Sequence, residues 1–265
     1  MARAPLVRPT DAPPTAHRET ASGPGPEATV PQEPVDAGAD VPRHGAIIMD
    51  GNRRWARAHG VPELDGHAAG VEAVRGILTH AVRRGIPALT LYAFSRENWA
   101  RTDAEVEGLF GLLEMAIRDE TAELRAQGVR VRLLGRLDEL PEATRRSLGE
   151  ALAATADGER LQLSIAFNYA GRTEIVDAVR AIVRSGIPAD AIDESTVSGA
   201  LYTAGQPDPD LVIRTGGEHR LSNFLIWQSA YAELVLTETL WPDFGPAELD
   251  EALAEYALRS RRFGR

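Results

Sequence analysis

Gly45-Ala-Ile-Ile-Met49 is a short apolar run that leads directly into Asp50-Gly-Asn-Arg-Arg-Trp55. Three later stretches repeat this pattern of an apolar run before a polar cluster: Ala88–Phe94 before Ser95-Arg-Glu-Asn-Trp99, Leu161–Phe167 before Asn168, and Leu211–Ile213 before Arg214-Thr-Gly-Gly-Glu-His-Arg220. Short apolar runs that alternate with helical stretches are typical of buried parallel strands joined by crossover helices. Ligands of such sheets bind beyond the carboxyl ends of the strands, so we expect the polar clusters to meet in one cleft.

The rest of the chain completes an α/β pattern. Two more strands are predicted at Val129–Leu134 and Ala232–Thr237. Helices are predicted at Gly66–Arg84, Asp103–Gln127, Pro141–Thr155, Arg172–Ser185, Glu194–Thr203 and Pro246–Arg259. Residues 43–265 therefore predict a single α/β domain with a central, mainly parallel sheet flanked by helices. Residues 1–42 are rich in Pro, Ala, Gly, Glu and Thr, and we interpret them as a disordered leader that buries too little apolar surface to fold.

Composition narrows the class of protein. With 265 residues, 43% of them hydrophobic, the chain can bury one ordinary core. The absence of cysteine excludes a disulfide scaffold and a thiolate metal site. No apolar run is long enough for a membrane span or a signal peptide, so we expect a cytoplasmic protein. A net charge of −10 argues against nucleic acid as a partner, but it allows a small anion bound by arginines in a cleft.

The first polar cluster has the features of a diphosphate-binding turn. Gly51 lets the backbone approach an anion, and the helix that follows offers free N–H groups. Asp50 suits Mg²⁺, which commonly takes one or two carboxylates together with substrate phosphates. The alternative is that Asp50 only caps the helix, but a cap does not need the adjacent Arg53 and Arg54.

The other clusters also contain anion-binding residue types. Ser95 and Asn98 could donate hydrogen bonds to phosphate, and Arg101 could bind it bidentately. The alternative for this segment is a helix cap with a buried tryptophan. The glycine-centred loop from Arg214 to Ser222 contains two arginines, which indicates a second anion pocket rather than a plain surface turn.

Three further features allow more than one interpretation. A lone histidine at a helix start, such as His67, is more often a cap or a surface residue than a catalyst. Glu233 lies in an apolar strand and needs a partner, for which a cation is suitable. The arginine-rich end, Leu258–Arg265, is either a solvated tail or an arm that reaches an anion.

Four stretches together resemble the cis-prenyltransferases, the undecaprenyl (isoprenyl) diphosphate synthase family. They are His-Gly-Ala-Ile-Ile-Met-Asp-Gly-Asn from His44, Leu-Tyr-Ala-Phe-Ser-Arg-Glu-Asn-Trp from Leu91, Asp-Leu-Val-Ile-Arg-Thr-Gly-Gly-Glu-His-Arg from Asp210, and Trp-Gln-Ser-Ala-Tyr-Ala-Glu-Leu from Trp227. The resemblance runs from His44 to Gly264. It implies a Mg²⁺-dependent enzyme that condenses isopentenyl diphosphate with an allylic diphosphate into a Z-polyprenyl diphosphate. It also implies a homodimer and an apolar tunnel for the product. We further expect transient contact with a membrane surface for product release and, from the net charge, no nucleic-acid partner.

The resemblance assigns roles to individual residues. Asp50 and Asn98 are expected to act in catalysis, and Asp50 and Glu233 to hold Mg²⁺. The starter diphosphate is expected on the Asp50–Arg54 turn beside His67, isopentenyl diphosphate on the Arg214 loop, and the chain end in the partner's site. The substrate-binding residues expected are Gly51, Asn52, Arg53, Arg54, Trp55, His67, Ser95, Arg96, Glu97, Trp99, Arg101, Arg214, Arg220, Leu221, Ser222, Arg262 and Gly264.

Two positions depart from the family pattern. Glu63 stands where many members have an arginine against the starter's diphosphate, so that role is not transferred. Phe167 stands where a long-chain bacterial synthase has alanine, and it either narrows the tunnel or points to the other face of the sheet. These departures leave open a short-chain or head-to-middle synthase. A non-catalytic partner subunit is the remaining alternative, although the chain keeps Asp50, Asn98 and the arginines.

Overall fold

The computed structural model describes residues 41–259. The predicted leader, apart from its last two residues, and the predicted site residues Arg262 and Gly264 lie outside this range.

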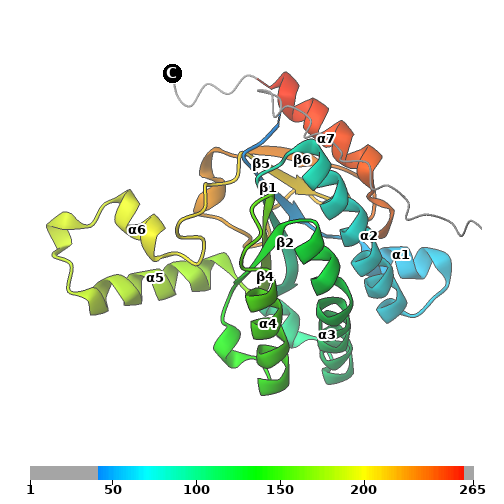
Figure 1. Ribbon diagram of the computed structural model, residues 1–265, viewed down its shortest axis with the longest axis horizontal. Coiled ribbons are helices and arrows are strands. Elements are labelled where there is room, and N and C mark those ends of the chain that lie inside the picture. Colours follow the sequence, from blue (N-terminus) through cyan, green and yellow to red (C-terminus); the bar gives the residue numbers. More distant parts are fainter. Residues whose placement is uncertain (1–40, 260–265) are drawn as a thin grey trace, which may run out of the picture. The chain divides into compact units, whose positions relative to one another are not determined.

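A six-stranded, entirely parallel sheet forms the centre of the domain (Figure 1). Its strands are β1 (His44–Ile48), β2 (Ala88–Ser95), β3 (Val129–Leu134), β4 (Leu161–Tyr169), β5 (Leu211–Arg214) and β6 (Glu233–Leu236). The strand order is β3-β4-β2-β1-β5-β6. From β1 the next strand in sequence, β2, is added on one side, whereas from β5 the next strand, β6, is added on the opposite side. Open parallel sheets bind ligands at such a reversal of strand order, which here lies beyond the ends of β1 and β5.

The described part of the chain has seven α-helices, of which the first six lie between strands and α7 follows the last strand. They are α1 (Asn52–His59), α2 (Glu63–Arg84), α3 (Asp103–Ala126), α4 (Glu142–Ala154), α5 (Gly171–Ser185), α6 (Glu194–Ala200) and α7 (Pro246–Leu258). A 3₁₀ turn, η1 (Arg96–Ala100), follows β2, and a second one, η2 (Leu137–Glu139), follows β3. Helix α2 begins three residues before the predicted start, since Pro62 precedes its first turn and Glu63 and Asp65 suit the positive end of a helix. No helix among residues 41–259 is both long and apolar enough to span a membrane.

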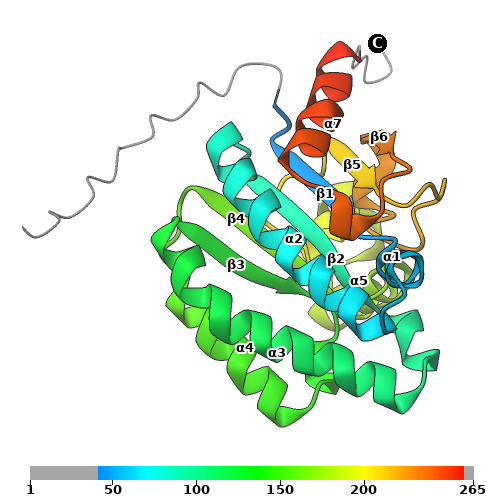
Figure 2. The ribbon, with the colours of Figure 1, turned by 90° about the vertical axis from the view of Figure 1, so that its right-hand side faces the viewer.

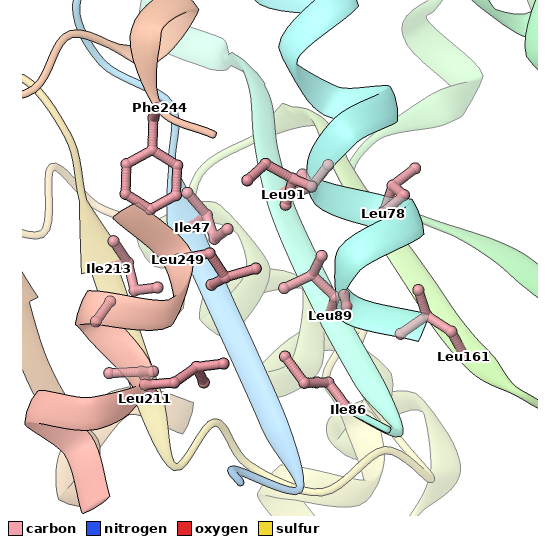
Figure 3. Close-up of a cluster of buried hydrophobic side chains, with 14 of the residues drawn as sticks. Ile47, Leu78, Ile86, Leu89, Leu91, Leu161, Leu211, Ile213, Phe244 and Leu249 are labelled. Carbon is pink, nitrogen blue, oxygen red and sulfur yellow. The ribbon is translucent and has the colours of Figure 1, made fainter. Parts of the chain in front are cut away.

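Each face of the sheet has its own apolar layer. On one face, Ile47, Leu89 and Leu91 pack against α2 and α7 (Figure 3), and α3 and α4 continue this layer across β3 and β4 (Figure 2). On the other face, Ala46 and Val212 pack against the segment around Phe224. Strands buried on both faces are the reason that the sequence shows continuous apolar runs instead of alternation.

Candidate active site

The loops that follow β1 and β5 hold each other by hydrogen bonds. The Asp50 N–H donates to Thr215 Oγ1 at 2.9 Å, and the same hydroxyl donates to the Asp50 carbonyl oxygen at 2.7 Å. Arg54 Nη1 donates to the Gly216 carbonyl oxygen at 2.5 Å. Gly216 has φ +80°, and a Cβ there would collide with the Arg54 guanidinium. The two predicted anion-binding loops therefore form one structure at the carboxyl edge of the sheet.

The Asp50 carboxylate lies between two arginines. Its Oδ2 is 2.8 Å from Arg214 Nη2, and its Oδ1 is 3.1 Å from Arg54 Nη2. Arg214 is 4% exposed and also donates to Ser222 Oγ at 2.7 Å, while its Nε is buried with no hydrogen-bond partner among the described residues. Asp50 is thus not the helix cap considered above, because Gly51 holds the N-cap position of α1 and the Asp50 carboxylate instead joins one arginine from each loop.

A polar hollow of about 310 Å³ opens beside this ion pair. It is lined by Met49, Asp50, Gly51, Asn52, Arg53, Arg54, Arg57, His67 and Arg101. The N-terminus of α1 faces it, and Gly51 at φ +123° makes the turn into the helix. A side chain at Gly51 would meet Leu240 at 2.9 Å. Four arginines and free N–H groups at a helix start form a binding site for a strongly negative group.

An apolar cavity of about 180 Å³ lies next to the polar hollow. Met49, Asn52 and His67 line both spaces, so the two adjoin each other at these residues. Side chains of β2, β3 and β4 form the floor of the cavity, and α2, α3 and α4 form its walls. A ligand that fits both spaces has an anionic head and an apolar tail.

His67 and Asn52 stand at the junction of the two spaces. His67 Nδ1 is 3.3 Å from Asn52 Nδ2, while His67 Nε2 and Asn52 Oδ1 are buried without a hydrogen-bond partner in the described part of the chain. Burial, and then the positive charge of Arg101, lower the pKa of His67, which keeps the ring neutral at neutral pH. His67 is therefore neither a cap nor a surface residue. Unsatisfied buried polar atoms at a junction of cavities indicate a place for ligand atoms.

The segment after β2 begins with a capping box. Asn98 Oδ1 accepts the Ser95 N–H at 2.9 Å, and Ser95 Oγ accepts the Glu97 N–H at 3.2 Å. The cap considered for this segment is thus present, but the tryptophan considered with it is not buried, since Trp99 is 42% exposed. Its indole ring packs edge-to-face against Phe94, and its N–H donates to the buried Asn168 Oδ1 at 2.8 Å.

Other side chains tie this segment to its surroundings. Glu97 accepts a hydrogen bond from Asn223 at 2.8 Å, which connects it to the loop after β5. Arg96 pairs with Glu139, and Arg101 lines the polar hollow and pairs with Glu105 at 2.7 Å. Ser95 and Asn98 do not line either of the two spaces.

The other predicted residues of the loop after β5 are exposed or partly buried. Arg220 is exposed and pairs with Glu218 at 2.5 Å, and Leu221 packs against the core of the second sheet face. Ser222 has φ +48°.

The predicted substrate-binding residue Trp55 lies in α1. Its indole N–H donates to Asp243 at 2.8 Å, so this ring contacts the protein away from the hollow.

Glu233 is not brought to Asp50 within one chain. It begins the edge strand β6 level with Leu211, whereas Arg214 pairs with Leu236, three residues or roughly 10 Å further along the strand. Its carboxylate is 3.1 Å from Arg259 Nη1, which is the cation that the sequence led us to expect. Among the described residues, no three His, Cys, Asp or Glu side chains are grouped to hold a metal ion. A metal site made of Asp50 and Glu233 therefore has no support in a single chain.

The two departures from the family pattern have clear surroundings. Glu63 accepts from Arg53 Nε at 2.6 Å and from Arg57 Nη2 at 2.8 Å, and these hydrogen bonds, that of Arg53 first, lower its pKa. Its negative charge is therefore balanced by the arginines of α1. Phe167 is 3% exposed and lines the apolar cavity, so it does not point to the other face of the sheet.

Sequence analysis missed several residues that shape the site. Thr215 connects the two loops, and Arg57 lines the polar hollow. Gly66 and Gly70 let α2 approach α1, because a Cβ at Gly70 would lie 2.5 Å from Asn52 Oδ1. The Gly-x-x-x-Gly spacing places both glycines on one side of the helix and was the signal available in the sequence.

Comparisons with known proteins show the family to which the chain belongs. The family model described as a putative undecaprenyl diphosphate synthase matches residues 48–264. An isoprenyl transferase of Heliobacterium mobile is 51% identical over 228 residues, covering 84% of this chain and 88% of the relative. The (2E,6E)-farnesyl-diphosphate-specific ditrans,polycis-undecaprenyl-diphosphate synthase of Pseudomonas aeruginosa is 46% identical over 229 residues, covering 85% and 91%.

Solved structures give the same result. Lavandulyl diphosphate synthase from Lavandula x intermedia, in complex with dimethylallyl diphosphate, superposes with a TM-score of 0.82 at 38% identity, covering 85% of this chain and 99% of the other. A probable undecaprenyl diphosphate synthase from Campylobacter jejuni gives a TM-score of 0.72 at 30% identity, covering 84% and 99%. With an all-parallel sheet, an arginine-lined hollow and an adjoining apolar cavity, the chain is a prenyltransferase of the undecaprenyl diphosphate synthase family.

Proposed function

We propose that this enzyme condenses isopentenyl diphosphate with an allylic diphosphate and makes a Z-polyprenyl diphosphate. The observation that carries the proposal is that the polar hollow adjoins the apolar cavity at Met49, Asn52 and His67, which line both. An allylic diphosphate has an anionic head and an apolar tail, and this pair of spaces accommodates both. Each methylene that the cavity takes from water contributes about 0.8 kcal/mol, which favours retention of a growing chain.

In this proposal the starter's diphosphate lies in the polar hollow. Arg54 and Arg101 and the first N–H groups of α1 bind its oxygens, and neutral His67 donates or accepts one hydrogen bond at the junction. These groups face the negative charge that grows on the diphosphate as the allylic C–O bond breaks. Fixed donors at such a position commonly supply several kcal/mol of transition-state stabilisation.

The second substrate occupies the loop after β5. Arg214, Arg220 and Ser222 bind the diphosphate of isopentenyl diphosphate, and the Arg214–Asp50 ion pair sets this pocket directly beside the first. Two substrates held next to each other gain the proximity advantage of an intramolecular reaction. Asn98 is a poor base, so we assign it an orienting hydrogen bond and assign proton acceptance to a substrate phosphate oxygen or water.

The residues at the hollow also suit Mg²⁺. Asp50 offers one partly exposed carboxylate next to the diphosphate position, and Mg²⁺ commonly binds one or two carboxylates with substrate phosphates. When bound, the ion would neutralise charge on the departing diphosphate. Glu233 is not included in this site, because it lies at the beginning of β6 and pairs with Arg259.

The remaining parts of the proposal concern assembly and product. We propose a homodimer in which Arg262 and Gly264 complete the partner's site, and transient contact with a membrane surface during product release. Because Phe167 lines the cavity, a short-chain product is the second candidate.

The test is incubation with isopentenyl diphosphate, Mg²⁺ and allylic starters of several lengths, followed by product sizing. Asp50→Ala should raise the activation barrier by several kcal/mol and so lower kcat strongly. The domain should remain folded, since Asp50 lies in a turn. Asp65→Ala, an exposed carboxylate in α2, is the matched control and should behave as wild type. Absence of elongated product from every starter, or activity of Asp50→Ala that resists EDTA, would contradict the proposal.

A further inference from the structure

Asn168 is a fully buried residue that the proposed reaction does not use. It ends one of the four apolar runs, is 0% exposed, and has φ +50°. Asparagine adopts this left-handed conformation more readily than most residues, but a buried amide is costly unless it is hydrogen-bonded. The side chain therefore needs specific partners.

All the hydrogen bonds of this amide go to segments around the site. Its Oδ1 accepts the Trp99 indole N–H at 2.8 Å. Its Nδ2 donates to the Arg136 carbonyl oxygen at 2.8 Å and to Glu139 Oε2 at 3.0 Å. The Arg136 N–H in turn donates to the Asn168 carbonyl oxygen at 3.3 Å, so the turn after β3 is held from both sides. The backbone there is close-packed, because a Cβ at Gly135 would overlap the Phe167 carbonyl oxygen.

These partners reach the segment that bears Asn98. Glu139 also accepts a hydrogen bond from Arg96, and that bond is the main reason for the lowering of the Glu139 pKa to about 2. Trp99 packs against Phe94 with ring centroids 5.8 Å apart. Asn168 is thus connected to the first residue of η1 through Glu139 and to its fourth residue directly.

We propose that Asn168 is a positioning residue that holds Trp99 directly and Arg96 through Glu139. It thereby fixes the orientation of the segment from Arg96 to Arg101. This segment carries Asn98 and ends at Arg101 in the polar hollow, and Trp99 covers Phe94, which lines the apolar cavity. The catalytic consequence rests on the proposed function, whereas the effect on Trp99 does not.

Asn168→Gly is the decisive variant, because glycine keeps the left-handed backbone and removes only the amide. Loss of the hydrogen bonds of this amide should lower kcat between about threefold and tenfold, with smaller changes in both KM values. Trp99→Phe should give a similar loss. The double variant should be no less active than the less active of the two single variants, because Asn168→Gly already removes the one hydrogen bond that Trp99→Phe removes.

A spectroscopic readout tests the same contact without turnover. The emission of Trp99, obtained as the difference from Trp99→Phe in each background, should shift to the red in Asn168→Gly and be quenched more readily by acrylamide. Thr144→Val, which removes a buried hydroxyl bonded to Glu114 at 2.7 Å, is the control and should change neither readout.

Several results would overturn the inference. They are unchanged Trp99 emission, unchanged kcat in an active enzyme, or additive losses in the double variant. If Asn168→Gly does not fold, Trp99→Phe alone must still show the loss in kcat. If the wild type makes no product from the two diphosphates, the proposed function fails, and the emission of Trp99 still decides whether Asn168 holds the segment.

Discussion

Phe167 is expected to limit the length of the product, and Phe167→Ala should shift the products to longer chains. The ring lines the apolar cavity and stacks on Phe94 with centroids 5.1 Å apart. Phe110 packs edge-to-face against Phe167, with ring centroids 5.5 Å apart. A tail that reaches this cluster meets a wall with little room to move.

The magnitudes favour a change in length over a loss of function. One added isoprene unit buries five carbons, which contributes roughly 4 kcal/mol while space remains. Pushing that unit into a packed wall costs about 1–3 kcal/mol and also forfeits its burial. Phe→Ala in a core typically costs 3–5 kcal/mol of stability, and part of this returns when a longer tail fills the space.

The assay is product sizing at a fixed ratio of isopentenyl diphosphate to starter, with unfolding measured in parallel. Phe224→Ala is the matched control, since this ring is 0% exposed and belongs to the core of the other sheet face. It should destabilise the domain to a similar extent and leave product length unchanged. An unchanged length distribution for an active Phe167→Ala variant would refute the reasoning, as would an equal shift in the control.

Three further predictions follow from the same structure. Arg220→Ala should raise the KM for isopentenyl diphosphate about tenfold and affect the starter less, since a charge-assisted hydrogen bond is lost from one pocket; equal effects in steady-state kinetics would contradict the assignment. Gly70→Ala should raise the KM for the starter, because its Cβ would lie 2.5 Å from Asn52 Oδ1, whereas Gly149→Ala points into open space and should change nothing. Burial lowers the pKa of His44 to about 4, so between pH 6.5 and 4 the unfolded chain binds a proton that the folded chain does not. The free energy of unfolding should therefore fall by up to roughly 3 kcal/mol as the pH drops through this window. Urea unfolding of His44→Gln should show a weaker pH dependence, and an equal slope would count against this role.

The sequence by itself determined the sheet and the edge at which the site lies. Strands buried on both faces need continuous apolar runs, and parallel strands place all their carboxyl ends at one edge. The polar clusters after Met49 and Ile213 therefore had to lie on the same side. Long stretches that match a known family also allowed the class of reaction to be predicted, because diphosphate binding depends on residue types at short, fixed spacing.

Only the tertiary structure decided which of these side chains meet. The contact between Asp50 and Arg214 depends on β1 and β5 being neighbours, and no local pattern encodes that strand order. The partners of Glu233 and Glu63 likewise depend on which helix ends and strand edges come together.

The directions in which buried side chains point also could not be predicted from the sequence. Phe167 lines the cavity where the register of β2 against β4 shifts around Phe94, and the packing of α3 and α4 forms the rest of the wall. Asn168 looked like one more polar strand end, yet it is fully buried and hydrogen-bonded to three residues of two segments. Short-range sequence patterns specify the helices and strands. Which side chains contact each other depends on how these elements pack, because each buried polar group needs a hydrogen-bond partner in the folded structure.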